Sequence, residues 1–153
     1  MKQPITQQLY EQDFCLWLEH TAQNLRSKNF GEIELEALVE EIEALGRSEK
    51  QELENRLDVL LAHLVKRIYI DSAYDNRGWE LTIQEQRKGL RRLLKKSPSL
   101  KNYFAEVFDE VWQDALSQVQ LEYRKVSFPD TWEFACDVDS LLSTTFWDTS
   151  SSS

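Results

Sequence analysis

Four polar residues of the predicted helices have the side chains that acid–base chemistry uses: Glu41, Glu49, Arg56 and His63. In a helix, residues seven apart lie within about 20° of each other, so the last three share one stripe. A histidine beside a carboxylate and a guanidinium could act as a general base or bind a ligand. The alternative is a polar helix edge, in which Glu49 pairs with Arg56 and a carbonyl or carboxylate satisfies His63.

A second candidate site is a basic surface for binding. Its six residues are Arg87, Lys88, Arg91, Arg92, Lys95 and Lys96. They follow two adjacent rows of one predicted helix, and such a surface could contact phosphates or an acidic partner. The alternative is a solvated face whose positive charge complements the ten acidic residues from Glu32 to Asp58. The formal net charge of −9 disfavours nucleic acid as the partner, because phosphate binding needs a basic field.

No metal site and no cofactor site is predicted. Carboxylate-bridged centres in helical bundles use Glu-x-x-His, and here Trp17 and Leu60 stand three residues before the two histidines. Glu40 and Glu43 have ligand-like spacing but fall on a face turned away from the apolar stripe. The four glycines are isolated, so none forms a phosphate loop, and no G-x-S-x-G motif supplies a nucleophile.

The elements that must position these residues are helices. Apolar residues recur at helical spacing, and only four glycines and three prolines interrupt the 153 residues. The pattern predicts an all-α fold: a single-domain helical bundle of about five helices over residues 1–149, with the C-terminal tail packed on it. Residues 150–153 are expected to be a frayed serine tail.

Local signals predict several helix boundaries. The first helix is expected over residues 6–27, and a second is expected to end at Gly46. Ser48 and Gln51 form a capping box that starts a new helix. Ser97-Pro98 predicts a helix start, with the serine as N-cap, and that helix continues to about Tyr123. A short helix is expected near residues 137–143.

The predicted break at Gly46–Ser48 depends on two arguments. The apolar run Leu38-Ile42-Leu45 is out of register with the run of leucines that starts at Leu53. One helix over residues 34–70 would be about 55 Å long, whereas a compact chain of this length has a diameter of roughly 40 Å. A continuous helix would therefore indicate a dimer.

Composition limits the protein's environment and partners. No apolar run approaches the ~18 residues that span a bilayer, so no membrane association is expected. The N-terminus lacks the layout of a signal peptide, and Cys15 and Cys136 form no CxxC pair. These features predict a cytoplasmic protein with two free thiols.

Several stretches of the chain resemble a bacterial family catalogued as domain of unknown function twenty-nine. They are Leu9-Tyr10 with Asp13 and Trp17, Glu40-Glu41-Ile42-Glu43, Gly46-Arg47-Ser48-Glu49, His63-Leu64 with Lys66, Trp79 with Thr82-Ile83, Gln86-Arg87, and Ser97-Pro98-Ser99-Leu100. The resemblance runs from Leu9 to Leu142 and departs at residues 67–70, where members usually have an aromatic residue and then a glutamine. It implies a helical intracellular domain and brings no activity, so no catalytic residue is carried over.

Two functions remain as hypotheses. The residues favour a non-catalytic protein-interaction module, with a protein partner or a second copy of the chain, because no catalytic motif stands out. The alternative is a small hydrolase or nuclease-like enzyme centred on the four candidates Glu41, Glu49, Arg56 and His63. A cleft that gathers those four would favour the enzyme, and an exposed apolar face would favour the interaction module.

Overall fold

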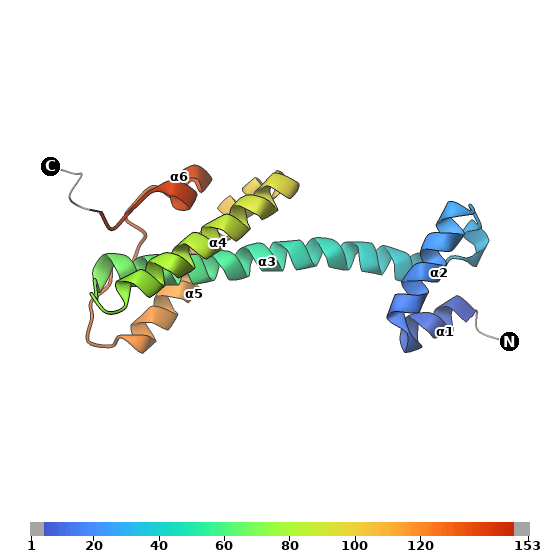
Figure 1. Cartoon of the computed structure of the whole chain (residues 1–153), viewed down its shortest axis with the longest axis horizontal. Helices are drawn as coiled ribbons and strands as arrows, with labels where there is room; N and C mark the ends of the chain where they lie inside the picture. The colour runs from blue at the N-terminus through green and yellow to red at the C-terminus, as the bar shows by residue number, and fades with distance from the viewer. Residues whose placement is uncertain (1–4, 149–153) are drawn as a thin grey trace. The chain divides into compact units, whose positions relative to one another are not determined.

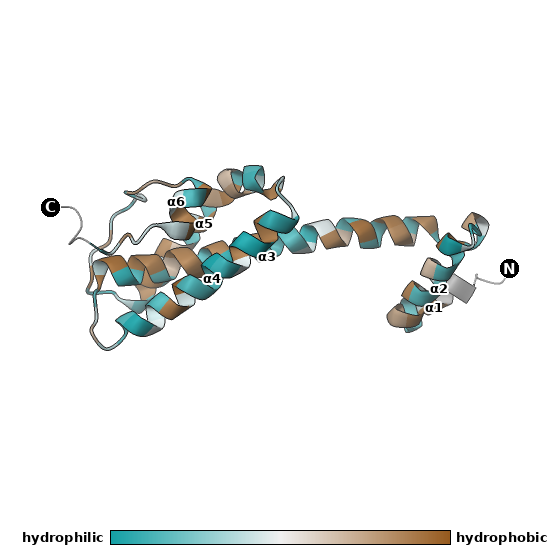
Figure 2. Cartoon of the chain, turned by 45° about the horizontal axis from the view of Figure 1, so that its top comes forward, coloured by the Kyte–Doolittle hydropathy of each residue, from teal (hydrophilic) through white to brown (hydrophobic). Residues whose placement is uncertain are grey.

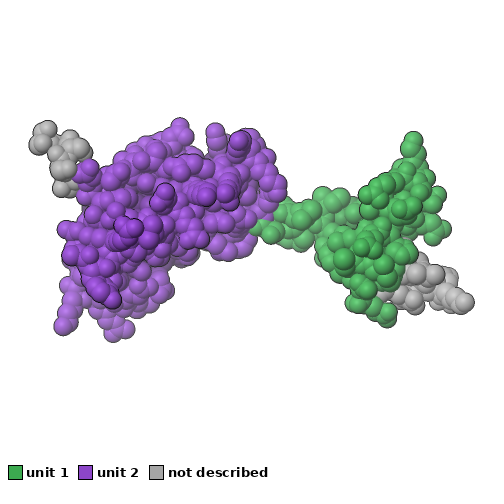
Figure 3. Space-filling view, in the orientation of Figure 1, with its two compact units in different colours: residues 1–48 green, residues 49–153 purple. Residues whose placement is uncertain are grey.

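The computed structural model describes residues 5–148, and over that range the chain is all-α, which confirms the predicted fold class (Figure 1). The helices are α1 (Ile5–Gln12), α2 (Phe14–Arg26), the 3-10 turn η1 (Phe30–Glu32), α3 (Leu35–Tyr69), α4 (Asn76–Lys96), α5 (Leu100–Glu122) and α6 (Val138–Ser143). The chain divides into two compact units, unit 1 (residues 1–48) and unit 2 (residues 49–153) (Figure 3). One domain over residues 1–149 stays a prediction, and the expected frayed tail lies outside the described residues.

α3 is one helix of 35 residues, so the predicted break at Gly46–Ser48 is wrong. A glycine inside a helix costs about 1 kcal/mol, which many favourable residues on either side can offset. No glycine of the described chain adopts a positive φ, so Gly46 does not form a left-handed helix end. Ser48 and Gln51 lie in mid-helix, where the Gln51 amide donates to Asn55 Oδ1 at 2.9 Å, and the expected capping box is absent.

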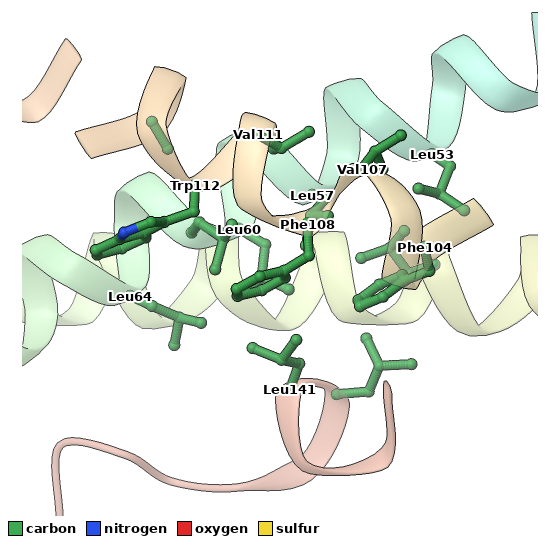
Figure 4. Packing of buried hydrophobic residues seen from close by; sticks show 14 of the residues in the cluster. Leu53, Leu57, Leu60, Leu64, Phe104, Val107, Phe108, Val111, Trp112 and Leu141 are labelled. Atoms are coloured by element: carbon green, nitrogen blue, oxygen red, sulfur yellow. The ribbon is translucent and has the colours of Figure 1, made fainter. Parts of the chain in front are cut away.

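The core of unit 2 forms around the second part of α3. The six fully buried side chains of α3 are Leu53, Leu57, Leu60, Leu61, Leu64 and Val65. They pack against apolar side chains of α4, α5 and α6, among them Ile83 of α4. Figure 4 shows Phe104 of α5 and Leu141 of α6 in this cluster. Phe128 and Phe146, which flank α6, are buried in the same cluster. The predicted packing of the C-terminal tail on the helices is therefore confirmed.

Two of the predicted boundaries in unit 2 have different outcomes. α6 begins after Asp137, whose Oδ2 accepts the Ser140 N–H at 3.0 Å, so the short helix is where it was expected. The start at Ser97-Pro98 is two residues too early. The Ser97 N–H still bonds to Leu93 O as the end of α4, and α5 begins only at Leu100.

Unit 1 begins with two helices where one was predicted. Asp13 separates α1 from α2, and its Oδ1 accepts the Leu16 N–H at 3.1 Å as an N-cap. The rings of Tyr10, Phe14 and Trp17 join the two helices, with Tyr10 and Trp17 at 4.7 Å between centroids. Trp17 is fully buried.

The central position of α3 in unit 2 gives a direct stability test. We expect Leu60→Ala to lower the free energy of unfolding by about 2–5 kcal/mol, because it leaves a cavity in the core. The matched control is Leu81→Ala at an exposed position of α4, which should change stability by no more than about 0.5 kcal/mol. Urea unfolding followed by circular dichroism measures both, and equal effects would contradict this core.

Candidate functional site

Glu41, the first of the four acid–base candidates, lies on α3 in unit 1. Its Oε1 accepts a hydrogen bond from the Tyr10 hydroxyl at 2.5 Å. This bond stabilises the protonated phenol and, with lesser contributions from burial and nearby glutamate charges, raises the pKa of Tyr10 to about 12. Glu41 thus fastens α1 to α3 within unit 1.

Glu49 and Arg56 lie on α3 in unit 2 and have separate partners. Glu49 accepts from Ser97 Oγ at 2.8 Å and pairs with Lys96 Nζ at 2.9 Å, and these bonds, led by Lys96, lower the pKa of Glu49. Arg56 binds Glu52 at 2.9 Å and Gln86 Oε1 at 3.1 Å. The expected Glu49–Arg56 pair does not form, because seven residues of helix separate their backbones by about 10 Å along the axis.

His63 has a structural partner of its own. Its Nδ1 lies 2.8 Å from Val59 O, one turn earlier in α3, as expected for a histidine satisfied by a carbonyl. Burial lowers the pKa of His63, the nearby Lys66 charge adds to the shift, and the Val59 bond and Glu122 oppose it. The structure therefore spreads the candidates along α3, and it brings no pair of them into contact as base and orienting group. A catalytic role for them stays a prediction.

The six basic candidates on α4 separate into two groups. Arg87 is only 8 % exposed, and its Nε and Nη2 donate to Leu141 O at 2.9 Å and Thr144 O at 2.6 Å. Arg91 donates to Leu142 O, so both arginines hold the C-terminal carbonyls of α6. Lys96 pairs with Glu49. Lys88, Arg92 and Lys95 are exposed, as are Arg91 and Lys96, so Arg87 is the buried member of the six.

The described residues show no clustered groups for metal binding, and their two cysteines form no disulfide. Within residues 5–148, no three or more His, Cys, Asp or Glu side chains lie close enough to hold a metal ion. Cys15 and Cys136 are both free and exposed. None of the helices in the described range combines the length and apolar character that a membrane span requires.

Unit 1 carries an exposed apolar surface that none of the polar candidates indicated. The large apolar side chains exposed there are Phe14, Leu16, Leu18, Leu25, Phe30, Leu35, Val39, Ile42 and Leu45. On α3, Leu35, Ile42 and Leu45 are exposed to 67 %, 59 % and 69 %. A groove on α3 is lined by two of these side chains, Leu35 and Val39, and by four charged ones, Glu36, Glu40, Glu43 and Arg47. We call these nine residues the unit 1 apolar surface.

The sequence contained a signal for this surface. An α-helix completes five turns in about 18 residues. Leu35, Val39 and Ile42 stand 18 residues before Leu53, Leu57 and Leu60, so they repeat the pattern of the buried face in unit 2. Leu38 and Leu45 are out of register with the buried leucines, whereas Leu35, Val39 and Ile42 are in register with them, so the apolar pattern runs unbroken through Gly46. Figure 2 shows hydrophobic residues recurring along α3 in both units.

The fold and the unit 1 apolar surface define the structural class of this protein. It is all-helical, with one well-packed unit and one unit rich in exposed apolar side chains. The chain belongs to the family described as Domain of unknown function DUF29, whose model matches residues 9–147. This match confirms the resemblance drawn from the sequence. Comparison with curated proteins finds no match, and comparison with solved structures finds none either.

The half-buried position of His63 predicts a pH dependence of stability. Because its folded pKa lies below the usual 6.5, the unfolded chain takes up the proton first as the pH falls. The stability that neutral His63 contributes is present above pH 6.5 and is lost as the pH falls through the folded pKa. We therefore expect His63→Gln to reduce the fall in Tm between pH 7.5 and pH 5.5.

The matched control for this prediction is His20→Gln, at an exposed position of α2. Differential scanning calorimetry of the three proteins at both pH values makes the comparison. The prediction would be contradicted if His63→Gln kept the whole fall in Tm of the unsubstituted protein.

Proposed function

We propose that this protein is a non-catalytic helical protein-interaction module that binds a second copy of itself through unit 1. The observation that carries the proposal is the imbalance within unit 1: nine large apolar side chains are exposed, while Trp17 is the one fully buried large side chain among its described residues. Soluble monomers rarely expose so much apolar surface, and large patches mark interaction sites.

The size of the unit 1 apolar surface supports a stable association. If each half-exposed side chain presents roughly 100 Å², the nine together present roughly 900 Å². A standard protein–protein interface buries about 800 Å² on each partner. The apolar area that these side chains expose is therefore of the size that a specific dimer buries on each copy.

The spacing along α3 supports a second copy as the occupant. Leu35, Leu38, Ile42 and Leu45 are separated by three, four and three residues, the spacing of helices that pack side by side. α2 contributes a further exposed row in the same unit, Phe14 with Leu18 and Leu25. α3 is unbroken and about 52 Å long. A continuous helix of this length is the feature from which the sequence analysis predicts a dimer.

The charges beside the surface distinguish a second copy from another kind of partner. Glu36, Glu40 and Glu43 are exposed on α3 near Leu35 and Val39. In a self-complex these acidic residues repel their copies, and salt screens that repulsion. A basic protein partner would instead be attracted to them, and salt would weaken its binding. The proposal places this self-association in the cytoplasm, where exposed Cys15 and Cys136 remain reduced.

The mass in solution tests the proposal. We expect light scattering to report a dimer, and Ile42→Glu to raise the dimer Kd by about 30-fold or more, because it buries a charge at the centre of the contact. The matched control is Leu81→Glu, which places the same charge on an exposed apolar position of α4 in unit 2 and should leave the mass unchanged.

Three outcomes of this experiment count against the proposal. A monomer at every concentration would overturn self-association, and so would a dimer that both glutamate variants leave intact. A dimer that loosens as salt rises from 50 to 500 mM would show that ionic contacts, not the unit 1 apolar surface, hold it together. Circular dichroism of each variant establishes that its helices have formed.

A further inference from the structure

A second feature, independent of the unit 1 apolar surface, is a groove in unit 2 between α4 and the segment after α6. Its volume is about 390 Å³. Arg87 and Arg91 line it from α4 together with Gln84, while Thr145 and Trp147 line it from the C-terminal segment. The groove is concave, mostly polar and lies wholly within unit 2.

The two arginines place two positive charges side by side in this groove. They stand four residues apart on α4, and burial together with the charge of Arg91 lowers the pKa of Arg87. Arginine remains charged in proteins, so the charges stay and must be balanced by other groups. Among residues 5–148, no carboxylate forms a salt bridge with either guanidinium.

The partners that these arginines have are neutral. Arg87 donates to Leu141 O and Thr144 O, and Arg91 donates to Leu142 O. Each guanidinium has five N–H donors, so most of them remain for another acceptor. The acidic side chain of the groove, Glu80, accepts from Arg67 Nε at 2.8 Å, and this pairing offsets its charge.

We propose that this groove binds a phosphate group, held by Arg87 and Arg91 and assisted by Gln84 and Thr145. A phosphate carries the charge that the two guanidiniums lack, and its oxygens match the planar fork of arginine donors. The carbonyls of residues 141, 142 and 144 fix both arginines before the ligand arrives, so little side-chain entropy is lost on binding. The groove has room beyond a single phosphate, and Trp147 provides a wall for an attached organic group.

Titration of the full-length chain with inorganic phosphate, at constant ionic strength in chloride, tests the site. Isothermal calorimetry should show saturable binding at one site. Gln84→Glu introduces a carboxylate beside Arg87 and Arg91 without touching the bonds to α6, and we expect it to weaken binding at least tenfold. The matched control is Gln113→Glu, an exposed position of α5 outside this groove, which changes the net charge equally and should leave the Kd within twofold.

Further arms separate the sources of the anion. Methyl phosphate that binds more tightly than inorganic phosphate would indicate a phosphorylated small molecule, and the reverse would indicate free phosphate. Acetate that binds as well as phosphate would overturn the choice of phosphate. Absence of saturable binding, or an equal loss of phosphate affinity in Gln84→Glu and Gln113→Glu, would overturn the proposal. Arg87 and Arg91 would then serve only to bind the carbonyls at the end of α6. The association state reports on unit 1 separately, so failure of this site does not affect the proposed function.

Discussion

Burial of one face of α3 is the constraint on which unit 2 depends. Six side chains between Leu53 and Val65 lose all contact with water, and each such burial contributes about 1.5–3 kcal/mol. α4, α5 and α6 supply the apolar surfaces that make this burial possible. Once α4 packs with Ile83 and Leu90 inward, Arg87 also lies in the interior, where the carbonyls at the end of α6 are its available acceptors.

The helical fold could be predicted because periodic apolar residues report local geometry directly. The ends of the helices are harder to predict, because they depend on small differences in free energy between neighbouring positions. Gly46 alone does not end α3, whereas Asp13 separates α1 from α2 with no change in the apolar spacing on either side. The side chain of Asp13 can cap the backbone of α2, and Gly46 has no group that could do so.

The candidate residues were identified by type, but their partners were not. Sequence spacing places Glu49, Arg56 and His63 on one stripe, but the same spacing separates neighbouring members by about 10 Å along the helix axis. Their actual partners include Ser97 and Gln86, which only tertiary packing brings near. Likewise, Arg87 and Lys88 are neighbours in sequence, and the position of α6, some fifty residues later, makes the first buried and leaves the second exposed.

The two units obtain their stability in different ways. Unit 2 buries its apolar side chains with residues of its own, as the cluster around α3 demonstrates. Unit 1 has Trp17 at its centre, and the indole N–H of that residue is buried without a hydrogen-bond partner, which costs about 1–3 kcal/mol. A unit with so small a core gains most from any surface that covers Leu35 and Ile42, because a partner that binds only the folded form adds its binding energy to folding. The same apolar periodicity that forms a closed core in unit 2 therefore leaves, in unit 1, a row of exposed apolar side chains on α3.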